Sequence, residues 1–270
     1  MSRVEIRNIG KEEALSLLSR KTENRTITEA HVDFLRGEML NGRFVFNGAT
    51  IVISKDGKLL DGQHRLTALS ETDLRFDLIF VLDANEDVFK TIDTGKNRCA
   101  GDILSIENIK NANAIAAMIR KVMDEFRSKR KTGKSGTIKL SNSEVLDYYN
   151  KNKDEIEDAM EMCSRLYNKE LKVITLSNAA AFLILFSRID KSKAKSFIRE
   201  LFTGVKEDNS NASQTLRKRL LNYRISGVRL DDSLLRALFI ISFKAYCENR
   251  DLTKIQVSKD LKEYTFLEEN

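Results

Sequence analysis

Proline and tryptophan are absent from this chain, and imidazole and thiol side chains are scarce. His31 and His64 are the only histidines, which excludes a histidine-rich metal site and leaves Mg²⁺ held by carboxylates as the metal chemistry still open. The three cysteines, Cys99, Cys163 and Cys247, lie far apart, are odd in number and lack the paired spacing of a metal site. We therefore expect buried free thiols rather than a disulfide framework.

Long apolar segments are also lacking. No apolar run approaches the length that crosses a membrane, and the first residues, Met1–Glu5, lack the apolar core of a secretory signal. The sequence therefore predicts a cytoplasmic globular protein with no membrane partner, and its 270 residues suffice for one large domain or two modest ones. The net charge of +6 permits a nucleic-acid partner without requiring one, because solvated lysines often produce such a balance.

The most informative stretch runs from 58 to 69, where polar residues able to hold a phosphate lie between two apolar segments. Just before it, an Asp-Gly pair at 56–57 separates two apolar runs and favours a tight hairpin, because glycine tolerates positive φ. The second strand then ends at Asp61. A helix begins at Gly62, since leucines recur after it at helical spacing.

The backbone and the side chains at this junction are both suited to an anion. Free N–H groups gather where a helix starts, glycine lets a ligand approach the main chain, and the helix dipole favours negative charge. His64 and Arg65 add side-chain donors, and the arginine fork matches phosphate oxygens. The ordinary alternative is that Asp61 caps the helix while Arg65 lies on a solvated face. We favour the phosphate site because five functional residue types meet at one strand-to-helix junction.

The segment Asp61–Ala68 resembles the Gly-x-x-Arg phosphate-binding signature of the ParB/sulfiredoxin-like superfamily, in the Asp-Gly-Gln-His-Arg form common among phage and plasmid proteins. The resemblance implies a phage- or plasmid-derived protein whose N-terminal α/β domain binds a nucleoside triphosphate, ATP or CTP, with Mg²⁺ as an optional ion. Within the motif it implies nucleotide or phosphate contacts from Gly62, Gln63, His64, Arg65 and Thr67. Sulfiredoxin chemistry is disfavoured, because members with that activity carry a reactive cysteine where this chain has Gln63.

Two further polar segments are candidates for the same pocket. Asn24 and Arg25 stand where the superfamily has an Asn-Pro-Arg-type loop before a helix, and the alternative is an ordinary loop between helices. Asp93 could hold a metal, and Thr94 or Lys96 could reach a phosphate. The alternative for this second segment is a solvated turn.

The pattern becomes helical almost throughout after Ala100, and Ala179–Phe186 is apolar nearly all round, which predicts the central helix of a bundle. Two basic groups in this region are candidates for binding DNA or RNA: the end of a long helix with the acid-free segment after it, and a stripe on a later helix. Their residues are Arg127, Lys129, Arg130, Lys131, Lys134, Arg217, Lys218 and Arg219. The alternatives are a solvated connector for the first group and, for the second, a surface helix whose long side chains cover a neighbour.

Together these patterns predict an α+β protein. A ParB/sulfiredoxin-like α/β domain is expected over residues 1–105, and an all-helical domain that could bind DNA or a partner over residues 106–270. Within the first we expect a strand over 43–46 and a short helix over 85–89, and within the second a last helix over 253–264.

Three functional hypotheses follow. The first is a nucleotide-binding ParB-like protein in which a triphosphate held by Gly62, His64 and Arg65 controls contact with DNA. The second is an NTPase or phosphotransferase, with Asp61 positioning a metal or nucleophile and His64 and Arg65 offsetting phosphate charge as catalytic groups. The third is a scaffold that binds a host protein. A homodimer is one possible assembly.

Overall fold

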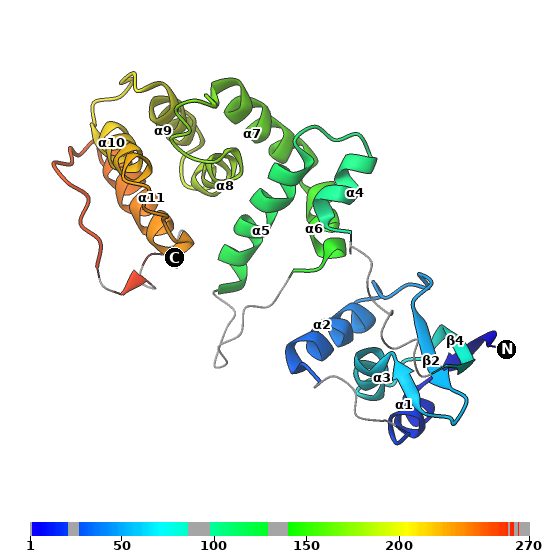
Figure 1. Ribbon diagram of the computed structural model, residues 1–270. Coiled ribbons are helices and arrows are strands. Elements are labelled where there is room, and N and C mark those ends of the chain that lie inside the picture. The colour runs from blue at the N-terminus through cyan, green and yellow to red at the C-terminus, as the bar shows by residue number, and fades with distance from the viewer. Residues whose placement is uncertain are drawn as a thin grey trace. The chain divides into compact units, whose positions relative to one another are not determined.

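The computed structural model describes residues 2–20, 27–85, 98–128, 140–258, 260–261 and 264, and it divides into two compact units (Figure 1). The first unit holds the described residues before 86 together with 140–141; the second holds those from 98 to 128 and from 142 onward. The first unit combines a sheet with helices, and the described part of the second contains helices without a sheet. The protein therefore belongs to the α+β class, in agreement with the sequence-based prediction. The helix Ala100–Ile106 belongs to the second unit, so the division lies before the boundary expected at 105.

Strands and helices are interspersed in the first unit. Its elements are β1 (Arg3–Ile9), α1 (Lys11–Leu18), α2 (Glu29–Leu40), β2 (Thr50–Ser54), β3 (Leu59–Asp61), α3 (Gln63–Ser70) and β4 (Phe76–Ala84). The four strands form a sheet in the order β1-β4-β2-β3, in which β1 runs antiparallel and β2 parallel to β4. The strands β2 and β3 pair as an antiparallel hairpin, as the Asp-Gly pair predicts. Strand β1 therefore forms one edge of the sheet.

The core of this unit lies between the sheet and the three helices. Ile51, Leu59 and Phe80 of the sheet are fully buried, as are Leu66 and Leu69 of α3. Burying a leucine side chain contributes about 1.5–3 kcal/mol. The two leucines therefore fix α3 against the sheet, and with it the position of the first turn of α3.

The second unit is helical (Figure 1). Its helices are α4 (Ala100–Ile106), α5 (Ala112–Ser128), α6 (Asn142–Lys151), α7 (Lys153–Leu166), α8 (Leu176–Ser187), α9 (Lys191–Thr203), α10 (Ala212–Ile225) and α11 (Asp232–Cys247). Every residue from Ala179 to Phe186 is buried, and α8 packs against α5, α7 and α9, so the prediction of a central helix is confirmed. Among the helices in the described part of the chain, none is long and apolar enough to cross a bilayer.

The strand predicted over 43–46 is wrong. After α2 the backbone N–H groups of Arg43 and Phe44 both donate to the carbonyl oxygen of Glu38, at 2.9 and 3.1 Å. These bonds close the end of the helix, and residues 43–47 have no regular structure. The Phe44 side chain packs edge-to-face on Phe76, so its apolar character serves the core rather than a sheet.

The helix predicted over 253–264 is also wrong in its described part, because residues 253–258 have no helical structure. Side chains of α10 hold this segment instead: the Thr215 hydroxyl donates to the Leu252 carbonyl at 2.9 Å, and the Arg219 guanidinium donates to the Ile255 carbonyl. These two bonds hold the segment against α10 in a non-helical path. Of the short helix predicted over 85–89, residues 86–89 lie outside the described part of the chain.

Candidate phosphate-binding site

The predicted strand-turn-helix junction is present at the end of β3. Gly62 stands between β3 and α3 with φ of +99°, in the left-handed region, and acts as the N-cap of the helix. A Cβ atom at this position would lie 2.3 Å from Cδ1 of Ile51, which is buried in β2. Both the backbone conformation and the close approach therefore require glycine.

Unpaired backbone donors gather at the start of α3. The Leu66 N–H bonds to the carbonyl oxygen of Gly62 at 2.9 Å, which closes the first turn. The described residues offer no acceptor for the N–H groups of Gln63, His64 and Arg65. These donors lie at the positive end of the helix dipole, an arrangement that suits a phosphate or carboxylate.

Arg65 is paired with Asp61 rather than solvated. A guanidinium nitrogen of Arg65 lies 2.8 Å from Oδ2 of Asp61, and the two side chains are only 19% and 24% exposed. No helix-capping bond from Asp61 occurs among the described residues, so the structure does not support the alternative of a capping aspartate with a solvated arginine. The pair fixes the direction of the guanidinium group, whose other N–H donors have no described partner. The Asp61 carboxylate also reduces the net positive charge next to the helix start.

His64 links the first turn of α3 to the first turn of α2. Its Nε2 accepts a hydrogen bond of 3.2 Å from the backbone N–H of Thr28, the N-cap residue of α2. A neutral imidazole that accepts at Nε2 carries its proton on Nδ1, which leaves Nδ1 as a donor. The His31 ring lies edge-on to the His64 ring, with 5.1 Å between centroids. The structure thus brings both histidines of the chain together at the start of α3.

Gln63 and Thr67 differ in what they leave available for a ligand. Gln63 is 6% exposed, and its Nε2 is buried without a hydrogen-bond partner among the described residues. A buried amide without a partner costs stability, so this group points to an acceptor that is not part of the described chain. The Thr67 hydroxyl donates to the carbonyl oxygen of Gln63 at 2.9 Å, which leaves only its lone pairs for a ligand.

Five predicted contacts lie outside the described residues: Asn24, Arg25, Asp93, Thr94 and Lys96. Among the residues that the structure does describe, no group of three histidine, cysteine or carboxylate side chains is placed to hold a metal ion. The site is therefore built here from one helix start and the side chains that meet it.

The basic stripe predicted on α10 is largely used inside the helical unit. The Arg217 guanidinium donates to the carbonyl oxygens of Leu201 and Phe202, at 2.6 and 2.9 Å, and so satisfies the end of α9. Arg219 holds the segment after α11, while Lys218 is exposed. Of the three side chains predicted to bind nucleic acid, two are therefore engaged within the unit and one is exposed. Lys129, Arg130, Lys131 and Lys134 lie outside the described residues, and Arg127 lies in α5 without a described side chain.

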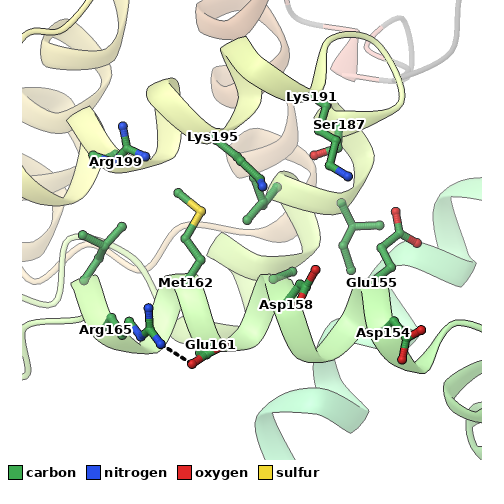
Figure 2. A pocket seen from close by; sticks show the side chains of 14 residues that line it. Asp154, Glu155, Asp158, Glu161, Met162, Arg165, Ser187, Lys191, Lys195 and Arg199 are labelled. Carbon is green, nitrogen blue, oxygen red and sulfur yellow. Dashed lines mark hydrogen bonds and ion pairs between the residues drawn. The ribbon is translucent and has the colours of Figure 1, made fainter.

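A hollow that was not predicted from the sequence lies within the helical unit between α7, α8 and α9 (Figure 2). Its volume is about 710 Å³, and its lining includes the apolar side chains Met162, Leu183 and Ile184. The α7 side is lined by Asp154, Glu155, Asp158 and Glu161, together with Arg165, which pairs with Glu161; the α9 side is lined by Lys191, Lys195 and Arg199 (Figure 2). No ion pair between described residues crosses it. In the sequence, the charged faces of this hollow could have been found from the acidic residues along α7 and the basic residues along α9, which recur every three or four positions. The α7 side of the hollow is thus mainly acidic and the α9 side basic.

Comparison with models of protein families, with curated proteins and with solved structures gave no match to this chain. The residues around Gly62 therefore provide the basis for a functional proposal.

Proposed function

We propose that this chain binds a nucleoside triphosphate through the phosphates at the start of α3. The observation that carries the proposal is the set of three adjacent N–H groups, of Gln63, His64 and Arg65, which have no acceptor among the described residues. Gly62 allows a phosphate to approach them closely, and the oriented Arg65 guanidinium adds charge. The likeness of this motif to the ParB/sulfiredoxin-like signature supports the same ligand class.

The side chains around the N–H groups have separate tasks in this proposal. Asp61 aligns Arg65, and His64 offers Nδ1–H while its Nε2 is tied to α2. The unpartnered amide of Gln63 donates to an oxygen of the bound nucleotide or of a water beside it. A phosphate would accept from the guanidinium N–H donors that Asp61 does not use.

Calorimetric titration of the full chain with ATP, CTP, GTP and UTP in the presence of Mg²⁺ tests the proposal. Arg65→Ala should weaken binding by on the order of ten- to a hundredfold, because a charged hydrogen bond to phosphate is worth about 1.5–3 kcal/mol. Arg36→Ala is the matched control, since Arg36 is an arginine of the same unit that pairs with Asp33 and Glu71. Binding of no nucleotide, or equal binding by both variants, would contradict the proposal.

We further propose that the nucleotide controls contact with DNA through the basic residues of the chain, whose net charge is +6. A ligand changes DNA affinity only if it binds one conformation better than another. The test is duplex binding with and without the nucleotide identified above, over a range of salt concentrations, because phosphate contacts make affinity salt-dependent. DNA affinity that the nucleotide leaves unchanged at every salt concentration would refute this coupling.

Hydrolysis or phosphoryl transfer is the second candidate function. It is favoured by Asp61, which places a carboxylate beside Arg65 and has only Oδ2 engaged among the described contacts. The second oxygen could take a Mg²⁺ ion that accompanies the phosphates. Phosphate release that disappears in Asp61→Asn while nucleotide binding persists would support this function, and no release with any of the four nucleotides would exclude it.

A further inference from the structure

Strand β1 is an open edge of the sheet. It is seven residues long, it pairs with β4 on one side, and no described strand pairs with its other side (Figure 1). Val4 and Ile6 on this strand are 69% and 62% exposed. An exposed edge with apolar side chains presents unpaired N–H and C=O groups and is a template for pairing with another strand.

The apolar side chains of β1 continue onto the neighbouring strand. Val4 stands opposite Val81 of β4 and Ile6 opposite Ile79, so the four lie on one face of the sheet. This face is the one turned away from the core that holds Phe80, the residue between them in β4. Pairing at the β1 edge would extend this apolar face across both partners.

The charged side chains of β1 lie on the other face, and Glu5 and Arg7 are paired with each other. Glu5 and Arg7 form an ion pair along the strand and are 42% and 44% exposed. The Arg7 guanidinium also lies over the ring of Phe80, 4.9 Å from its centroid. The two opposite charges therefore lie next to each other beside the open edge.

We propose that two copies of this chain pair through β1, antiparallel and centred on Ile6, to form one continuous sheet. In this register Ile6 faces Ile6 of the second copy, and Glu5 faces Arg7 of the second copy at two symmetric places. Each copy has its own Glu5–Arg7 ion pair, and the pairing adds two more between the copies. The four side chains therefore form a ring in which negative and positive charges alternate. The contact is closed by a two-fold axis, so it ends at a dimer rather than a fibre. It does not depend on nucleotide binding.

The charges also exclude the neighbouring registers. Other registers of the β1 pairing must keep the helices of both copies on the same face of the joined sheet. The next such registers lie two residues away, because side chains alternate between the faces along a strand. One such shift places Glu5 opposite Glu5, and the other places Arg7 opposite Arg7. Like charges directly opposite each other are destabilising. The register centred on Ile6 pairs the whole of β1 and sets opposite charges against each other.

Sedimentation of the full chain at increasing concentration, up to about 1 mM, tests the proposal. The wild-type chain should dimerise. Glu5→Arg alone and Arg7→Glu alone should each raise the dissociation constant about tenfold or more, because the two-fold axis repeats each like-charge contact. Glu5→Arg combined with Arg7→Glu restores the alternating ring and should return the dissociation constant to within about threefold of wild type.

Ile6→Lys should abolish the dimer, because it places two lysines together on the axis. Ile225→Lys is the matched control, since Ile225 is 83% exposed on α10 in the other unit. Circular dichroism and thermal melting of every variant separate loss of pairing from loss of fold. A wild-type chain that stays monomeric, single variants that dimerise as wild type does, or a combined variant that fails to recover would each overturn the proposal.

Discussion

Glu200 shows how a single buried charge organises its surroundings. This side chain of α9 is fully buried, and its carboxylate accepts hydrogen bonds from five donors. The donors are the N–H groups of Glu207 and Asp208, the hydroxyls of Ser213 and Tyr246, and the amide of Gln214. None of the five is a cation, so the carboxylate is held by hydrogen bonds, and these tie α9 to the loop before α10, to α10 itself and to α11.

Glu200→Gln is therefore expected to be strongly destabilising. The amide would turn an N–H₂ group toward donors that now bond to an oxygen, at a cost of about 3 kcal/mol in the free energy of unfolding. Tyr246→Phe removes one donor only and should cost about 1 kcal/mol. Urea unfolding followed by circular dichroism measures both. An unfolding free energy of Glu200→Gln equal to that of wild type would show that the network adds no stability.

At the scale of elements, the β3–α3 junction depends on the contact between Gly62 and Ile51. Gly62→Ala should destabilise the protein by about 1–3 kcal/mol, because it strains the left-handed backbone and forces Cβ against Cδ1 of Ile51. Gly57→Ala is a matched control: Gly57 also has positive φ, at +77°, but a Cβ there meets no atom within 4 Å. The measurement is thermal unfolding of both variants.

Ile51→Val separates the two causes, because it removes the Cδ1 atom that an alanine at position 62 would strike. The cost of Gly62→Ala should be smaller when measured in Ile51→Val than in the wild-type chain, and close to the cost of Gly57→Ala. An unchanged cost would mean that backbone strain alone requires the glycine.

At the scale of the whole molecule, the three thiols differ in how the fold covers them. Cys99 is exposed, Cys247 is intermediate, and Cys163 is fully buried in α7, where burial raises its pKa from 9 to about 12. Because the thiolate is the reactive form, a thiol reagent at slightly alkaline pH should label Cys99 in the native protein and Cys163 only after unfolding. Mass spectrometry of labelled peptides measures this. Rapid labelling of native Cys163 would contradict the described packing.

The raised pKa of Cys163 also predicts a pH dependence. Its contribution to stability is fully present below about pH 9 and is lost as the pH rises toward about 12, because the unfolded chain releases the thiol proton first. The unfolding free energy of the wild-type chain should therefore fall more steeply over this interval than that of Cys163→Ala. Equal slopes would show that burial does not perturb this thiol.

The local patterns were predictable where neighbouring residues decide the structure. The Asp-Gly hairpin, the helix start at Gly62 and the buried helix α8 all follow from signals within a few residues, and all three are present. The strand over 43–46 failed because the carbonyl of Glu38 takes two N–H groups that a strand would need. The helix over 253–264 failed where Thr215 and Arg219 of α10, distant in sequence, hold the chain by the carbonyl groups of Leu252 and Ile255.

The sequence by itself determined the α+β class, the junction at Gly62 and the presence of an arginine next to the first free N–H groups, because these depend on backbone geometry and local spacing. The tertiary structure alone decided the partners of the charged side chains. It turned Arg217 to the end of α9, directed Arg219 to the segment after α11 and placed Arg7 over the ring of Phe80 in β4. A long charged side chain can reach many partners, and only the packing of distant elements selects one of them.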